Sequence, residues 1–160
     1  MKKNFIVLIA VVSLFACSKS DEMSPGGSDL NAFFDFSVFN SQNIDLLDPA
    51  TPDHYKEEEI KLFYEVDGEI IEVYDPNMGA PRNFSIYKHE NEYRIKVYLN
   101  HTETSEKPIT YIQWNDTDTD TIEATFKRNR YYIEVSQVWL NELEIWDSTM
   151  VDNQYFKLIK

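Results

Sequence analysis

The stretch Ile60-Lys61-Leu62-Phe63-Tyr64-Glu65-Val66-Asp67-Gly68-Glu69-Ile70-Ile71-Glu72-Val73-Tyr74 decides the fold class of this 160-residue chain. Before Asp67-Gly68, apolar side chains alternate with polar ones, which is the period of a half-buried β-strand, and a second β-like run follows. Asp-Gly suits a tight type I′ turn, because both central residues of that turn need a positive φ. The sequence therefore predicts a β-hairpin here.

Similar segments recur along the chain, and turn residues separate them. Nine or ten short strands are expected, including the hairpin above, residues 34–38, 84–87, 93–99, 109–114, 122–126, 131–135 and 155–159, and a last hairpin within 138–146. The one helix-like patch, 54–59, is expected to be a turn. Many short strands without a convincing helix predict an all-β, antiparallel β-sandwich.

The predicted sandwich is immunoglobulin-like in architecture only, because the chain lacks the Cys…Trp…Cys pattern of antibody domains. An up-and-down β-barrel is the alternative fold. Aromatic residues make up 14% of the chain, which favours a packed domain over a disordered one.

The N-terminus has the layout of a secretory signal peptide. Lys2 and Lys3 precede an apolar run over residues 5–16. A helix of this length reaches roughly 18 Å, which is too short for a hydrocarbon core of about 30 Å. Residues 1–16 are therefore predicted to be a cleaved signal.

The apolar run ends in Leu14-Phe15-Ala16-Cys17, which resembles the bacterial lipobox. The resemblance implies that diacylglycerol is attached to the Cys17 thiol and that signal peptidase II cuts before this residue. Cys17 is the single cysteine, so an internal disulfide is impossible. We expect three segments: the signal at 1–16, a lipidated Cys17 with a flexible tether at 17–31, and one β-sandwich domain at 32–160.

The charge of the chain narrows the range of partners. Its 15 basic and 28 acidic residues give a net charge of −13, which becomes −15 once Lys2 and Lys3 are removed with the signal. Such a charge disfavours nucleic acid and anionic membrane surfaces. Contact with the membrane is expected through the lipid anchor only.

Several segments resemble small Bacteroidota surface lipoproteins of unknown function. They are the acidic stretch 18–22 behind Cys17, residues 43–49 and 83–87, the hairpin at Asp67-Gly68, and the ending 138–158. The resemblance implies an outer-membrane protein facing the cell exterior. It supplies no catalytic residues.

Three carboxylates spaced two apart, Asp116, Asp118 and Asp120, form the candidate metal site, because calcium prefers hard oxygen ligands. Thr121 and Lys127 stand where an EF-hand loop needs Gly and Glu, so an acidic loop or a solvated strand face is the alternative. No other cofactor is expected. His54, His89 and His101 lack a metal-binding spacing.

Trp114, Trp139 and Trp146 are candidate ligand-binding residues, because aromatic rings stack on the apolar faces of sugars. Core packing is the alternative. Glu142 and Glu144 could pair as acid and base in a small hydrolase, although 28 acidic residues produce such pairs by chance. No pattern activates Ser85, Ser136 or Ser148.

The sequence therefore favours a non-enzymatic, membrane-anchored surface lipoprotein that acts as an interaction or accessory module for an unidentified protein or glycan. A glycan-binding accessory protein of a polysaccharide-uptake system is the first alternative, and a small hydrolase is the second.

Overall fold

A computed structural model describes residues 29–150 and 153–160. The predicted signal peptide, Cys17 and residues 17–28 of the tether lie outside the described residues. Residues 29–31, which the sequence assigned to the tether, form strand β1 (Asp29–Asn31). The tether prediction is therefore wrong at its last three residues.

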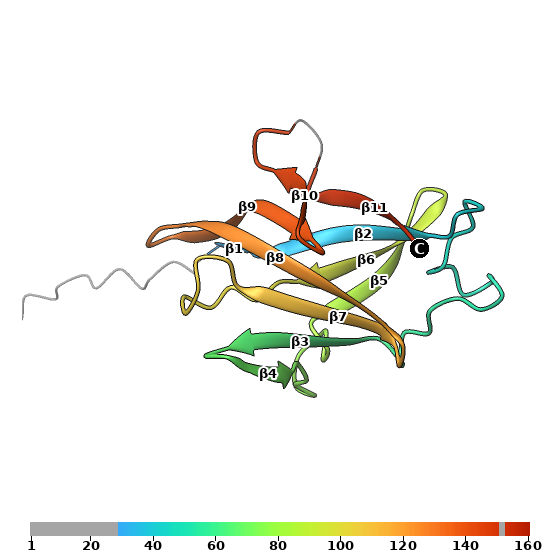
Figure 1. The fold of residues 1–160 in the computed structure, drawn as a ribbon, viewed down its shortest axis with the longest axis horizontal. Helices are drawn as coiled ribbons and strands as arrows, with labels where there is room; N and C mark the ends of the chain where they lie inside the picture. The colour runs from blue at the N-terminus through green and yellow to red at the C-terminus, as the bar shows by residue number, and fades with distance from the viewer. Residues whose placement is uncertain (1–28, 151–152) are drawn as a thin grey trace, which may run out of the picture.

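Eleven strands form two sheets in the described residues (Figure 1). Sheet A has the strand order β1-β9-β8-β7-β3-β4, and β10 also pairs with β9. Besides β1, its strands are β3 (Lys61–Val66), β4 (Glu69–Glu72), β7 (Ile109–Asn115), β8 (Asp118–Arg128), β9 (Tyr132–Leu140) and β10 (Leu143–Asp147). Sheet B has the order β11-β2-β6-β5; its strands are β2 (Phe33–Phe39), β5 (Phe84–His89), β6 (Glu92–Tyr98) and β11 (Tyr155–Ile159).

The all-β prediction is confirmed. The prediction of purely antiparallel sheets and the alternative of a β-barrel both need correction. The sheets are mixed rather than antiparallel, because β1 pairs with β9 and β11 pairs with β2 in parallel. The two sheets do not close into a barrel, so the alternative fold is wrong. Parallel pairing joins segments that are distant in sequence and leaves no local turn signal to predict it.

The inner faces of the two sheets share one hydrophobic core, which gives a sandwich-like arrangement. Phe34, Phe36 and Val38 alternate along β2 and are almost fully buried. The facing side chains of sheet A include Ile112, Trp114, Ile122, Ala124, Val135 and Val138. The chain passes from sheet A to sheet B at the buried Ala32, so one continuous segment begins both sheets.

The two predicted hairpins, at Asp67-Gly68 and within 138–146, are present, and both turns contain residues with positive φ. Asp67 and Gly68 have φ values of 53° and 82°, as a type I′ turn requires. Asn141 and Glu142 also have positive φ at the turn from β9 to β10. Residues 57–59 form a turn, which agrees with the expectation for the 54–59 patch. Across the described ranges, no helix has the length and apolarity needed to span a membrane.

Candidate functional site

The connection between β4 and β5, residues 73–83, crosses from the edge of sheet A to the edge of sheet B. Local hydrogen bonds fold it back on itself: the Asp75 amide donates to the Pro81 carbonyl at 2.8 Å, and the Asp75 carboxylate accepts from the Asn77 amide at 2.9 Å. Pro76 and Pro81 restrict the backbone further. These contacts give the loop a defined conformation, and together with the β3–β4 hairpin it lines a hollow.

Three hollows border this loop, and we call them together the loop groove. Their volumes are about 430, 390 and 570 Å³. Tyr74 lines the first two, while Tyr64, Met78 and Asn83 line the last two. The hollows are thus adjacent along one side of the molecule.

Exposed apolar side chains gather around the loop groove. Ile71, Tyr74 and Met78 line it and are 50%, 60% and 55% exposed. Strand β4 is the free edge of sheet A and is exposed along its whole length. A large concentration of exposed apolar residues on a folded domain marks an interaction surface.

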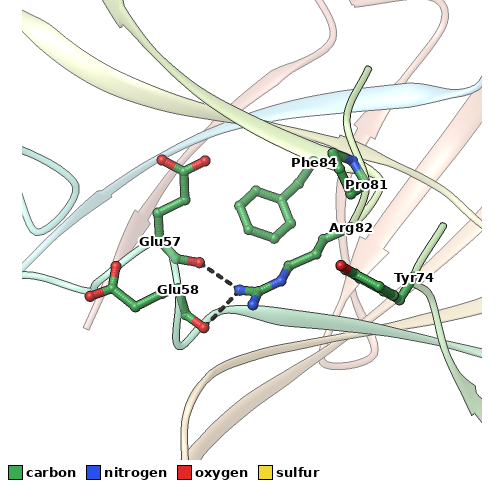
Figure 2. A pocket seen from close by; sticks show the side chains of 6 residues that line it. All are labelled: Glu57, Glu58, Tyr74, Pro81, Arg82 and Phe84. Carbon is green, nitrogen blue, oxygen red and sulfur yellow. Dashed lines mark hydrogen bonds between the residues drawn. The ribbon is translucent and has the colours of Figure 1, made fainter. Parts of the chain in front are cut away.

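Arg82 forms one wall of the first hollow (Figure 2). Its Nη1 donates to the carbonyl oxygens of Glu57 at 3.1 Å and Glu58 at 2.7 Å, as the dashed lines in Figure 2 mark. The side-chain carboxylates of these two residues point away from the guanidinium in the same view. Arg82 therefore fixes the 57–59 turn against the groove, and the buried Phe84 ring forms the floor between them.

Two polar side chains hold the opposite wall of the groove in place. The Tyr64 hydroxyl donates to the Tyr98 carbonyl at 2.8 Å and lies 3.1 Å from Asn83 Nδ2. Burial raises the pKa of Tyr64, although the hydrogen bond from Asn83 opposes the shift. The phenol is therefore neutral at physiological pH, and it acts here as a structural hydrogen-bonding group.

The loop groove carries an acidic rim. Glu57, Glu58, Glu72 and Asp75 line it, against Arg82 and against Lys61, whose Nζ lies 3.9 Å from the Glu72 carboxylate. A partner that enters the groove would meet apolar side chains surrounded by negative charge. Such a surface favours a partner of complementary, basic character.

The three predicted ligand-binding tryptophans do not form a common platform. Trp114 and Trp146 belong to the core, with only 1% and 6% of their surface exposed. Trp139 lies half-buried on the other side of sheet A, where the Lys107 ammonium is 4.0 Å from its ring centroid. The prediction of a shared stacking face is therefore wrong, because strand alternation directs the rings to different sides.

The candidate calcium residues occupy unequal positions. Asp116 is exposed in the turn before β8, whereas Asp118 and Asp120 lie within β8, and Asp120 is only 5% exposed. Lys160 Nζ lies 2.6 Å from a carboxylate oxygen of each of the latter two. The alternative of a solvated strand face is therefore wrong for Asp120, which shares the inward side of β8 with Ile122.

Asp120 is the centre of a buried polar network. It accepts hydrogen bonds from Trp114 Nε1 at 2.7 Å and from Asn141 Nδ2 at 2.8 Å. Burial alone would raise the pKa of Asp120, but the hydrogen bonds from Lys160, Asn141 and Trp114 outweigh it and lower the pKa below the ordinary range. A calcium ion here would have to displace the Lys160 ammonium, and calcium binding stays a prediction.

The remaining sequence candidates are dispersed. Within the described residues no group of three or more His, Cys, Asp or Glu side chains could hold a metal. His54 and His101 contact the Thr51 and Leu99 carbonyls through Nδ1. Glu142 and Glu144 are exposed at the last hairpin. Ser136 Oγ lies 2.8 Å from the Thr125 hydroxyl.

Sequence reasoning missed the loop groove. The segment 75–81 was interpreted only as a connection, because Pro, Gly and Asn are typical of loops. The signal that could have indicated a site is the pair Tyr74 and Met78, two large apolar side chains that the strand pattern leaves without a buried face. Comparison of the chain with protein-family models, curated proteins and solved structures finds no match.

Proposed function

We propose that this chain is a non-enzymatic interaction module that a lipid on Cys17 anchors to the outer membrane, facing the cell exterior. The lipobox-like Leu14-Phe15-Ala16-Cys17 and the acidic residues behind it support the anchor and its location. Multiple acyl chains would hold the protein stably at the bilayer. The apolar, acid-rimmed loop groove is the observation that carries the interaction role.

The partner we propose for the groove is an extended protein segment with apolar side chains flanked by lysine or arginine. Exposed Ile71, Tyr74 and Met78 offer the apolar contact. The four carboxylates on the rim would select basic flanks and steer them by long-range attraction. The chain's net charge of −13 acts in the same direction.

A pair of matched synthetic peptides tests this role. One carries Lys around an apolar centre, and the other carries Glu at the same positions; binding to the full chain is followed by isothermal titration. We expect only the basic peptide to bind. Tyr74→Ser should weaken it by about tenfold or more, because truncating an interface anchor costs about 2 kcal/mol.

Leu143→Ser is the matched control, since Leu143 is 66% exposed in β10 at the far side of sheet A. It should leave peptide affinity unchanged. Equal binding of both peptides, or equal loss in the Tyr74 and Leu143 variants, would contradict the groove as the docking site.

Intact mass spectrometry of the native protein tests the anchor. We expect a mature chain that begins at Cys17 and carries fatty acids, and a Cys17→Ser variant that no longer fractionates with the outer membrane. A native form that starts elsewhere or has no acyl mass would overturn the proposed localisation.

We propose glycan binding as the second candidate function, within a polysaccharide-uptake system. The three tryptophans do not support it, because they form no common face. A cavity lined by Asp35, Arg94 and Lys96 does support it, because hydrogen-bonding side chains suit a ligand rich in hydroxyl groups.

We propose an immunoglobulin-like packing for the two layers, with their strands crossing at roughly 30°. The shared core of the two inner faces supports this proposal.

Hydrolysis has the least support, since Glu142 and Glu144 are exposed at a hairpin.

A further inference from the structure

A further cavity, with a volume of about 490 Å³, is lined by residues of both sheets. Its residues come from β2, β5, β6 and the start of β11 in sheet B, from β1, β9 and β10 in sheet A, and from the segment between β10 and β11. Asp35 and Lys96 are cross-strand partners on β2 and β6, and Tyr87 and Arg94 are partners on β5 and β6. We call it the sheet B cavity, defined by Asn31, Asp35, Tyr87, Arg94, Lys96 and Tyr155.

Two buried acceptors in this cavity lack a donor. Asn31 Oδ1 and Asp35 Oδ1 are inaccessible to solvent and have no hydrogen-bond partner among the described residues. The second oxygen of Asp35 accepts from the Tyr87 hydroxyl at 2.8 Å, which fixes the carboxylate. Since buried polar atoms are normally satisfied, these two acceptors in residues that line one cavity call for a donor that the described residues do not supply.

The same cavity presents donors that aromatic rings hold in place. Lys96 Nζ lies 4.0 Å from the Phe33 ring centroid, and the Arg94 guanidinium stacks 3.8 Å from the centroid of Tyr155. Lys96 makes no ion pair among the described residues, whereas Arg94 Nε donates to Glu92 at 2.6 Å. A ligand must therefore accept hydrogen bonds as well as donate them.

Both signs of charge are present around the cavity. Arg94 and Lys96 are basic and Asp35 and Glu134 are acidic among the lining residues, and Glu92 pairs with Arg94 beside them. A ligand with a large net charge would meet both signs, so a neutral ligand fits better. The aromatic side chains Phe33, Tyr87 and Tyr155 add apolar surface to the lining.

We propose that the sheet B cavity binds a neutral sugar unit. Each hydroxyl of a sugar both donates and accepts, so one ligand satisfies Asn31 and Asp35 as acceptors and Lys96 and Arg94 as donors. The C–H faces of the ring fit the aromatic lining. The inference rests on the second candidate function and supplies the site and ligand class for it.

Saturation-transfer NMR on the full chain tests the proposal with glucose, galactose, mannose and N-acetylglucosamine as probes. Glycine and inorganic phosphate are run in parallel as a zwitterion and an anion. We expect at least one sugar to bind and neither small ion to compete with it. Competition by either ion, or no signal from any of the four sugars, would overturn the proposal.

Two variants place the site. Asp35→Asn keeps the side-chain shape and Lys96→Met keeps its length, and each should weaken the sugar by at least about tenfold through the loss of charge-assisted hydrogen bonds. Lys157→Met is the matched control, because Lys157 is exposed on β11 of the same sheet and does not line the cavity. Thermal melts establish that each variant is folded.

If Asp35→Asn fails to fold, Tyr87→Phe removes only the hydroxyl that fixes Asp35, and it should also weaken the sugar. Sugar binding that survives in both cavity variants would contradict this site while leaving glycan binding itself in place. Loss of sugar binding in Lys157→Met as well would contradict the site too. Binding of the basic peptide at the loop groove is independent of all these results.

Discussion

At the scale of single residues, Asp120 shows how a charge is kept inside the sandwich. Its carboxylate takes hydrogen bonds from Trp114 and Asn141 and an ion pair from Lys160, each at 2.8 Å or less. Because these partners fully surround the charge, removing it leaves buried donors without acceptors. Asp120 is therefore a structural residue of the core network.

Asp120→Asn should lower the free energy of unfolding by about 2–3 kcal/mol at pH 7, since one buried charge partner is lost. Urea denaturation measures the change. Asp116→Asn is the control: this side chain is exposed in the turn, and its replacement should change stability by less than about 0.5 kcal/mol. Equal effects of the two substitutions would contradict the buried network.

The same carboxylate predicts a dependence on pH. The pKa of Asp120 is lower in the folded protein than the ordinary value of 3.8, so the unfolded chain takes up the proton first as the pH falls. Its stabilisation is complete above that value and is lost as the pH falls through the folded-state pKa. Urea unfolding between pH 6 and about pH 2 should show a shallower loss in Asp120→Asn than in the unsubstituted chain. Parallel curves would contradict the pKa shift.

The tryptophans make a further prediction at this scale. Trp114→Ala and Trp146→Ala should each destabilise the fold by about 3–5 kcal/mol, because each leaves a large cavity in the core. Trp139→Ala should cost about 1 kcal/mol, as expected for a half-buried position. Denaturant unfolding ranks the three, and a costly Trp139 substitution with a harmless Trp146 one would contradict their placement.

At the scale of elements, the hairpins were predictable and the strand order was not. Asp67, Gly68 and Asn141 are of the residue types that positive φ favours, so the local sequence indicates those turns. The partners of β1 and β11 come from distant segments, and only tertiary packing selects them. The inward position of Asp120 was readable, since it stands in phase with Ile122 and Ala124 on β8.

The sites were less predictable than the elements, and for a physical reason. Alternation along a strand shows which side chains share a face, but it does not show which face is covered. Trp114 and Trp146 were therefore compatible with a surface role until the second sheet was placed over them. Both the loop groove and the sheet B cavity combine segments from different strands, which sequence spacing does not reveal.

The turn at Gly68 gives the prediction at the element scale. Gly68 has a φ of 82° and open space around a Cβ added there, so Gly68→Ala tests backbone conformation alone. It should cost about 1 kcal/mol, because an L-residue is strained in the left-handed region. Gly79→Ala is the control, with open space and no positive φ, and should be neutral or slightly stabilising. Equal effects in urea unfolding would contradict the type I′ turn.

At the scale of the whole molecule, one core holds two sheets together against the repulsion of an acidic surface. The net charge of −13 at pH 7 acts on every part of the fold, while the ion pairs act locally and most are partly exposed. Exposed pairs contribute about 0–1 kcal/mol each. The global repulsion should therefore dominate the response to salt.

Raising the NaCl concentration from 0.01 to about 0.15 M shortens the Debye length from about 30 to about 8 Å, so repulsion between distant carboxylates is screened. We expect the melting temperature at pH 7 to rise by a few degrees. The same titration near pH 4.5, the isoelectric point, is the control, and there the rise should vanish because the net charge is close to zero. A melting temperature that falls with salt at pH 7 would contradict this expectation. It would mean that local ion pairs, above all those of Lys160 with Asp118 and Asp120, stabilise the fold by more than the long-range repulsion destabilises it.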